Sequence, residues 1–232
     1  MVVEIKEKIK IDFNAPHPDY FNKSNELIAG TTTALKELAN PALIGWAYKE
    51  GKAGRPLNAK RDKAANIGTI AHEILKGKDL GYGIDNSNIQ PDNWKLAKEC
   101  IKSHNAWFKG LKSVKTIFVE KPLVSELYQY GGTIDKYCTI SKQHTLIDYK
   151  SGKDIYEEYL YQAAAYTNLL IENGYKVDRA LIVNMPKESG DNFKVLSVST
   201  KSLLNNGYFD VFLKSVEIYY ARKKIKNLKE VI

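Results

Sequence analysis

Two acidic residues and a lysine, Asp135, Asp148 and Lys150, are the side chains of this sequence most suited to chemistry. Asp135 closes the segment Gly132-Thr133-Ile134-Asp135, and Asp148 follows it thirteen residues later. If the two segments form a hairpin that turns near residues 141–142, residues whose numbers sum to 283 are paired. Asp135 then lies opposite Asp148, with Cβ atoms about 5 Å apart. Lys150 shares the face of Asp148, because strand side chains alternate between faces.

The same register predicts that Ile134, Ile147 and Tyr149 point to the opposite, apolar face. Two carboxylates that face each other in a sheet repel, so Lys150, a proton or a bound cation must offset the repulsion. A hard divalent ion with oxygen ligands also accounts for the geometry. The alternative is a surface cluster of two aspartates and a lysine without a function, since the Asp-x-Lys tripeptide is common.

The elements that must position these residues follow from hydrophobic periodicity and breaker residues. An irregular arm is expected over residues 1–29. Helices are expected at 31–38, 42–50, 63–75, 91–111, 155–173 and 201–226, and strands at 116–124, 130–140, 145–150, 177–184 and 193–199. This order of helices, three-strand meander, helix, strand pair and helix predicts an α/β sandwich with a mixed central β-sheet flanked by helices.

Length and composition predict one domain. The 232 residues divide into an N-terminal arm with helices (1–62), a core (63–200) and a C-terminal helix (201–232). Cys100 and Cys138 lie far apart, which excludes a cysteine-only zinc or four-cysteine iron–sulfur site, and both are expected to be small buried residues. No apolar run approaches the roughly 18–20 residues of a membrane-spanning helix, and the N-terminus lacks a signal peptide, so a cytosolic location is expected.

Positive charge is the main compositional signal. The net charge of +8 suits a polyanionic partner but is weak evidence alone. Between Lys49 and Lys63 six basic residues stand against Glu50 and Asp62, which fits either a solvated loop or a phosphate-contacting one. Tyr156, Tyr159 and Tyr161 could stack on bases or pack at the edge of the core.

Further motifs surround the Asp135 and Asp148 segments in a fixed order. Gly68–His72 reads Gly-x-x-x-His and precedes them, Gln162–Tyr166 reads Gln-x-x-x-Tyr and follows them, and Glu120 lies on the strand before Gly-x-x-Asp. Together these motifs resemble the RecB-like branch of the PD-(D/E)XK nucleases over about residues 68–166. The resemblance implies a restriction-endonuclease-like core preceded by a helical segment.

The same resemblance implies a metal site. His72, Asp135 and Asp148 would ligate Mg²⁺ or Mn²⁺, and the backbone carbonyl of Tyr149 is a further candidate ligand. Lys150 would orient or deprotonate the attacking water, or stabilise negative charge on the phosphate. Such a site suits phosphodiester hydrolysis, because a divalent cation activates water and polarises the phosphoryl oxygen.

Other residues of the motifs have more open roles. Gln162 and Tyr166 are one helical turn apart, so they would position the nucleic-acid strand or brace the site. Glu120 could act behind the ligands, bind a second metal, or be purely structural. His72, flanked by Ala71 and Ile74, would without the other motifs be interpreted as a core histidine.

The resemblance leads to three hypotheses about function. The first is a metal-dependent exonuclease that acts on DNA ends and prefers single strands. The second is a structure-selective, flap-type endonuclease in recombination or replication, and the third is a non-catalytic nucleic-acid-binding protein on a nuclease fold. The sequence lacks a Gly-x-x-x-x-Gly-Lys-Ser/Thr phosphate loop, so the chain is expected to be a stand-alone nuclease or one that depends on a separate helicase or recombination partner. Iron–sulfur members of the branch carry four cysteines, which this chain does not have.

Overall fold

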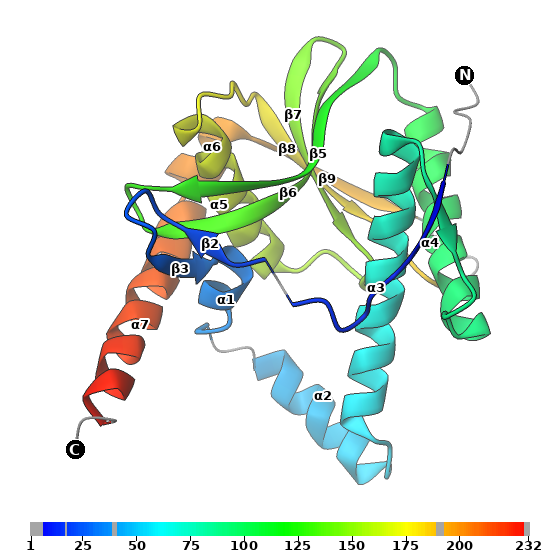
Figure 1. Cartoon of the computed structure of the whole chain (residues 1–232), viewed down its shortest axis with the longest axis horizontal. Helices are drawn as coiled ribbons and strands as arrows, with labels where there is room; N and C mark the ends of the chain where they lie inside the picture. Colours follow the sequence, from blue (N-terminus) through cyan, green and yellow to red (C-terminus); the bar gives the residue numbers. More distant parts are fainter. Residues whose placement is uncertain (1–6, 17, 39–40, 189–192, 230–232) are drawn as a thin grey trace.

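The computed structural model describes residues 7–16, 18–38, 41–188 and 193–229 of the chain (Figure 1). Its centre is a mixed seven-stranded sheet with the strand order β2-β3-β6-β7-β8-β9. β3 and β7 pair with successive parts of one edge of β6, and β5 pairs along the other edge. The expected mixed sheet flanked by helices is confirmed.

The core of the sheet is the meander of β5 (Val114–Ser125), β6 (Tyr130–Ile140) and β7 (Gln143–Lys150). The β6–β7 ladder runs from Ile140↔Gln143 to Lys136↔Ile147, so paired numbers sum to 283 as predicted. Ser141 and Lys142 have φ values of 50° and 70° and form the turn between them. Two central residues with positive φ are typical of the tight hairpin that matches the twist of the strands.

The remaining strands extend the sheet on both sides. β8 (Arg179–Asn184) is parallel to β7, and β9 (Lys194–Ser199) is antiparallel to β8. On the other side β3 (Leu27–Gly30) is parallel to the first residues of β6, and β2 (Tyr20–Phe21) is antiparallel to β3. The N-terminal segment was expected to be irregular, and these pairings correct that expectation. Two further short strands, β1 (Lys8–Lys10) and β4 (Gly83–Asp85), form a separate parallel pair.

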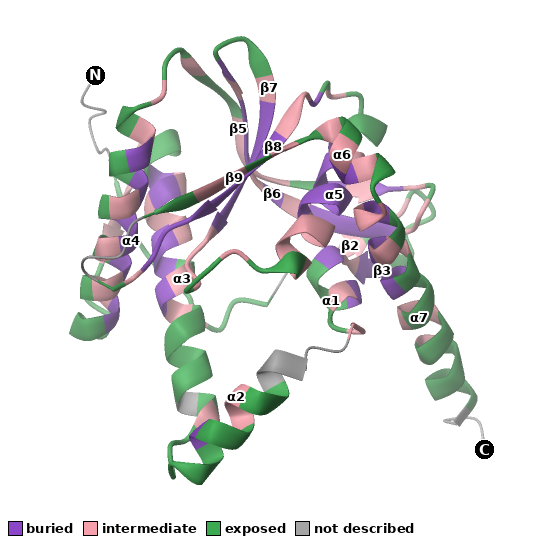
Figure 2. Ribbon diagram, turned by 180° about the vertical axis from the view of Figure 1, so that it is seen from behind, coloured by how far each residue is buried: buried purple, intermediate pink, exposed green. Residues whose placement is uncertain are grey.

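Helices cover both faces of the sheet (Figures 1 and 2). One apolar core lies under α1 (Thr31–Leu35), α5 (Glu157–Glu172), α6 (Thr200–Asn205) and α7 (Tyr208–Lys229). The other lies under α3 (Leu57–Leu80) and α4 (Pro91–Lys109), and it contains both buried cysteines as expected. Among the described residues no helix is long and apolar enough to cross a lipid bilayer.

Two helical predictions differ from the structure. The helix expected over 201–226 is divided into α6 and α7, because Gly207 has a φ of 89° between them. The helix expected over 63–75 is the middle part of α3, which begins at Leu57 and ends at Leu80. The first half of α3 and α2 (Pro41–Lys52) form a helical arm that extends away from the sheet (Figure 1).

Candidate active site

One edge of β6 changes partner in the middle of the strand. Gly131 is the last residue of β6 that pairs with β3, and Lys136 is the first that pairs with β7. The intervening segment, which contains Asp135, has no ladder partner on that edge among the described strands. Instead, the Asp135 carboxylate accepts a hydrogen bond from the backbone N–H of Tyr149, with Oδ2 at 2.8 Å. The side chain of Asp135 therefore joins β6 to β7 where the backbones do not.

Glu120 lies on the other side of Asp135 at a break in the β5–β6 ladder. Val119 pairs with Lys136 and Lys121 pairs with Ile134, but Glu120 and Asp135 between them are not bridged. Glu120 has a φ of 47°, a conformation that residues with a side chain rarely adopt. Such backbone strain costs of order 1–3 kcal/mol and is concentrated at functional sites.

His72 reaches the same place from α3. Its Nε2 lies 3.1 Å from the carbonyl oxygen of Tyr149, and its Nδ1 lies 3.7 Å from Oδ1 of Asp135. With the proton on Nε2, the imidazole donates to that carbonyl and Nδ1 presents a lone pair. Gly68, one turn earlier, allows the approach of α3 to the loop after β7, because a Cβ there would lie 3.0 Å from Oγ of Ser151.

These three side chains form a group that could hold a metal ion. One ligand atom from each of His72, Glu120 and Asp135 lies within 4.8 Å of the other two. Two carboxylates and an imidazole suit Mg²⁺ or Mn²⁺. The sequence pattern pointed to His72, Asp135 and Asp148 as ligands. The structure brings the first two together with Glu120 and holds Asp148 in a different contact.

Asp148 forms a buried ion pair with Lys150. Its side chain is 1% exposed, and Nζ of Lys150 donates to Oδ1 at 2.9 Å while lying 2.7 Å from Oδ2. Oδ2 is therefore paired with the ammonium group, although the angle there does not suit a hydrogen bond. A carboxylate oxygen has further acceptor capacity, so a cation or a cation-bound water beside Asp135 and His72 could share Oδ2 with Lys150.

A chain of polar contacts extends from this ion pair along α5. Nζ of Lys150 also donates to Oε1 of Gln162 at 2.8 Å, and the Gln162 amide donates to the hydroxyl of Tyr166 at 2.8 Å. The ring of Tyr159 lies 5.0 Å from Nζ and covers the ammonium group from another side. Tyr166 fits against β6 because Gly132 has no side chain, as a Cβ there would lie 2.6 Å from Cε1 of Tyr166.

Two carboxyl groups of the site, Glu120 and Asp148, have raised pKa values. Burial, with the neighbouring Asp135 acting in the same direction and His72 in the opposite one, raises the pKa of Glu120 to about 7. Burial also raises the pKa of Asp148 to about 6, with Lys150 acting in the opposite direction and Asp135 in the same direction. Each shift means that an additional positive charge would be favourable here. A divalent cation would supply that charge.

The faces of the strands differ from the prediction at one residue. Ile147 and Tyr149 pack toward α3 and α4, whereas Ile134 packs in the other core with Tyr137, so the three do not share a face. The alternation of β6 shifts by one residue between Ile134 and Tyr137, beside the unbridged pair of Glu120 and Asp135. This local shift is what allows Asp135 to meet a histidine from the α3 side of the sheet.

Sequence reasoning did not include Tyr20 in the site. Its hydroxyl is 2.9 Å from Oγ1 of Thr133, and its ring covers Gly131, where a Cβ would lie 2.3 Å from Cγ of Tyr20. Tyr20 and Tyr166 thus lie against the adjacent glycines Gly131 and Gly132 of β6. Adjacent glycines inside a strand are a sequence signal for close approach by other groups, although they do not identify which groups approach.

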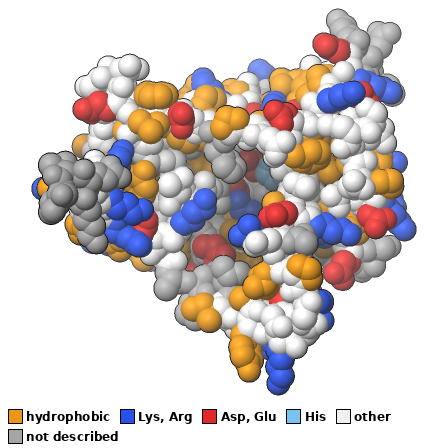
Figure 3. Space-filling view, turned by 60° about the horizontal axis from the view of Figure 1, so that its bottom comes forward, with side chains coloured by type: hydrophobic (Ala, Val, Ile, Leu, Met, Phe, Trp, Pro, Cys, Tyr) orange, Lys and Arg blue, Asp and Glu red, His pale blue; other side chains and the backbone are white. Residues whose placement is uncertain are grey.

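The site opens on the face of the molecule beside the helical arm. In Figure 3 acidic side chains and a histidine are visible at the bottom of a hollow, with Lys and Arg side chains around it. The side chains of His72 and Asp135 are partly exposed, by 29% and 14%. The group is therefore accessible to a ligand from outside.

Comparison with known proteins gives little beyond this geometry. The sequence matches no established protein family and no curated protein. A crystal structure of a protein from Eubacterium rectale, provisionally called an exonuclease, is similar with a TM-score of 0.47 and 17% sequence identity. The match covers 69% of this chain and 65% of that protein. This degree of likeness is too weak to assign a family or an activity.

Proposed function

We propose that the chain is a divalent-metal-dependent nuclease that hydrolyses phosphodiester bonds in DNA. The observation that carries the proposal is the convergence of His72, Glu120 and Asp135, with ligand atoms within 4.8 Å, beside the buried pair of Asp148 and Lys150. Carboxylates, an imidazole and an ammonium group in one accessible hollow suit a reaction in which negative charge develops on a phosphate.

The proposed cation is Mg²⁺ or Mn²⁺, held by His72 Nδ1 and by carboxylate oxygens of Glu120 and Asp135. Asp148 contributes through Oδ2, directly or through a water, and the Tyr149 carbonyl orients the imidazole. When bound, such a cation lowers the pKa of its water and polarises a phosphoryl oxygen. Because Glu120 and Asp148 have raised pKa values, binding would also release protons near neutral pH.

The remaining side chains of the site provide a positive charge and keep it in position. Lys150 has a side chain 15% exposed, so its ammonium group is mostly shielded from water yet can face a phosphate in the hollow. Gln162 keeps the ammonium group in position, and Tyr166 in turn fixes the amide of Gln162. Preorganised groups of this kind stabilise charge most effectively, because they need no rearrangement during the reaction.

DNA is the proposed substrate, and an exonuclease acting on DNA ends with a preference for single strands is the proposed activity. The net charge of +8 supports binding of a polyanion. Because the sequence has no phosphate-loop motif, any unwinding of the substrate would fall to a separate helicase or recombination partner. Recombination or repair is the proposed setting.

A digestion time course tests the proposal. Single- and double-stranded DNA, labelled at the 5′ or the 3′ end, is incubated with Mg²⁺ or Mn²⁺, and a parallel reaction contains EDTA. We expect metal-dependent shortening from an end, fastest on single strands, and no cleavage of circular single-stranded DNA. Cleavage of the circle would replace the exonuclease with the endonuclease. Salt-sensitive binding without a product in either metal would contradict a nuclease.

A further inference from the structure

We propose that Arg61, on the arm side of α3, binds the phosphodiester backbone of a nucleic-acid strand whose scissile phosphate lies at His72. This inference rests on the proposed function and names a second contact for the same substrate. It concerns an arginine that lies outside every motif of the site.

The regularity of α3 places Arg61 and His72 on one face. The helix is continuous from Leu57 to Leu80, and the two residues are eleven positions apart. At 3.6 residues per turn, eleven positions correspond to just over three turns, so their side chains project within about 20° of each other. The rise of 1.5 Å per residue separates them by about 16 Å along the helix. Arg61 therefore points in the same direction as the metal-site histidine, further down the arm.

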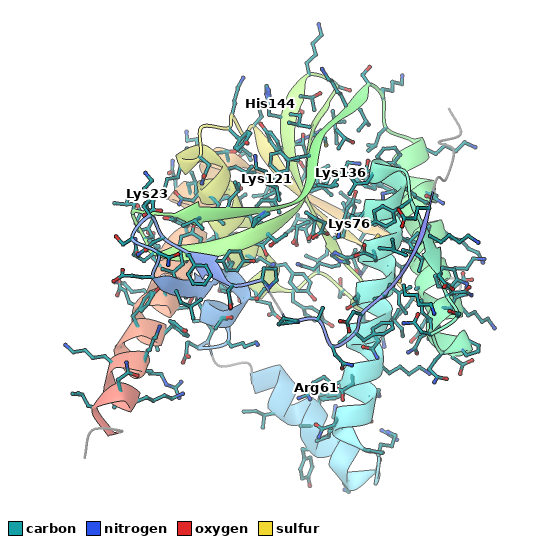
Figure 4. All side chains as sticks on the ribbon, viewed as in Figure 1. Lys23, Arg61, Lys76, Lys121, Lys136 and His144 are labelled. Carbon is teal, nitrogen blue, oxygen red and sulfur yellow. The ribbon has the colours of Figure 1, made fainter. Side chains whose placement is uncertain are left out.

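The side chains of α3 between the two residues are short. Ala65 and Gly68 are the intervening residues on this face of α3, and neither has a long side chain. The buried residues of the helix, Ile67, Ile70, Ala71 and Leu75, form an adjacent stripe that packs in the core under α3 and α4. At 100° per residue this stripe is centred roughly 100° away from Arg61. In Figure 4 Arg61 lies on the side of α3 that faces the space beneath the sheet, as does Lys76 higher on the helix. A strand could follow this face from the hollow to the arm.

The charge of Arg61 is available to a phosphate. Its side chain is 70% exposed, and its contact among the described residues is Asp62, with Nε 3.3 Å from Oδ1 and 61% exposure of the aspartate. Such an exposed pair contributes little and is easily exchanged for a phosphate. By contrast, Arg55 and Lys60 are both bound to the buried Glu50, at 2.6 and 3.1 Å, and serve to join α2 to α3.

Spacing defines how long a strand must be to reach Arg61. A stacked strand rises about 3.4 Å per nucleotide, so 16 Å corresponds to roughly five nucleotides, and fewer if the strand is extended. A substrate with a single nucleoside cannot bridge this distance. Arg61 is thus expected to affect long substrates only. It is a binding residue for the strand and makes no contact at the reacting phosphate.

Binding and cleavage measurements separate this inference from the proposed function. Fluorescence anisotropy with labelled dT12 in EDTA compares the wild type, Arg61→Ala, Arg61→Lys and the control Lys98→Ala, which removes one exposed charge from α4. Hydrolysis of thymidine 5′-monophosphate p-nitrophenyl ester with Mn²⁺ reports on the metal site alone. Circular dichroism confirms that each variant is folded.

We expect Arg61→Ala to weaken dT12 binding at least threefold and to reduce the slope of log affinity against log salt by about 0.7, the value of one phosphate contact. Arg61→Lys should restore most of the affinity, and Lys98→Ala and the small ester should show no change. Equal affinities for the wild type and Arg61→Ala, or an equal loss in Lys98→Ala, would overturn the inference. Absence of ester hydrolysis in every protein would instead contradict the proposed function, and the binding comparison would still decide on Arg61.

Discussion

Asp148 and Lys150 form an ion pair between residues two apart on one strand, and Nζ lies 2.7 Å from Oδ2 of a carboxylate that is 1% exposed. The chain contains a comparable pair with the same spacing, Lys176 and Asp178, at 3.5 Å, in which the lysine side chain is 70% exposed. Substitutions in the two pairs therefore separate the effect of burial and location on cleavage from the effect of sequence spacing.

We predict that Lys150→Ala and Asp148→Ala each lower single-turnover DNA cleavage by on the order of 10²–10³-fold, because a preorganised charge is removed from the site. Lys176→Ala should leave cleavage unchanged and alter stability by less than about 1 kcal/mol, as expected for an exposed pair. Circular dichroism checks that the variants fold. Wild-type cleavage rates in Asp148→Ala with Mg²⁺ present would remove this residue from the mechanism.

Gly132 provides a test of how closely α5 packs on the site. A Cβ at this position would lie 2.6 Å from Cε1 of Tyr166 and 2.8 Å from Oγ1 of Thr31. Gly132→Ala should therefore lower the free energy of unfolding by about 1–3 kcal/mol through overpacking. It should also lower the rate of cleavage, since Tyr166 must move and this weakens the hydrogen bond that its hydroxyl accepts from Gln162.

The matched control for Gly132→Ala is Gly45→Ala in the middle of α2. Apart from the backbone of the helix itself, no atom of the described residues lies within 4 Å of a Cβ at Gly45. This change should stabilise the helix by up to about 1 kcal/mol, the difference in helix propensity. Urea denaturation measures both variants. The same sign of change in the two variants would show that the close contact at Gly132 is not what determines the result.

Much of the meander could be predicted because its signals are local. Alternating residues and a two-residue turn define the β6–β7 register, and the predicted pairing of Lys136 with Ile147 holds in the structure. The break between α6 and α7 also has a local signal in Asn206 and Gly207, which the prediction of one long helix overlooked.

Other features depend on contacts between distant segments. The β2 strand is two residues long and exists through its pairing with β3, so periodicity does not reveal it. Similarly, the positive φ of Glu120 and the shift of alternation after Ile134 depend on how β5 and β6 bend together. For this reason the sequence identified Glu120 as a residue of interest without defining its role.

Tyr20 links the N-terminal segment to the site, and removal of its hydroxyl group tests this contact. Tyr20→Phe deletes the hydroxyl that lies 2.9 Å from Thr133 Oγ1 and keeps the ring over Gly131. We expect the free energy of unfolding to fall by about 1 kcal/mol, the usual net value of one hydrogen bond. The control is Tyr48→Phe, at a tyrosine 70% exposed on α2, which should show no change. Equal denaturation midpoints for Tyr20→Phe and the wild type would contradict the contact.

The buried imidazole of His104 should make the free energy of unfolding depend on pH. The imidazole stacks on Phe108 and contacts Trp107 and Tyr149. Burial, opposed by the hydrogen bond to Asn105 and assisted by Lys78 and Lys136, lowers its pKa from 6.5 to about 4. The unfolded state therefore binds a proton more readily between these two pH values. Stability should fall as the pH decreases from about 6.5 to about 4, by on the order of 3 kcal/mol in total.

Replacement of His104 with phenylalanine should remove this part of the pH dependence, because the new ring fills the site and does not titrate. Urea denaturation at pH 7.5, 6, 5 and 4.5 compares the two proteins. The curves should diverge progressively below pH 6.5, with the variant more stable at low pH. Parallel curves over the whole range would show that His104 does not titrate as its burial predicts.

Cation binding is the central claim, and isothermal titration calorimetry with Mn²⁺ at pH 7.5 tests it most directly. The wild type should bind the ion, and Asp135→Asn, which changes one ligand at the point where His72 and Glu120 converge, should bind on the order of tenfold more weakly or worse. Asp178→Asn, a carboxylate that pairs with Lys176 elsewhere, should bind like the wild type. Equal Mn²⁺ affinities for the wild type and Asp135→Asn would contradict the account.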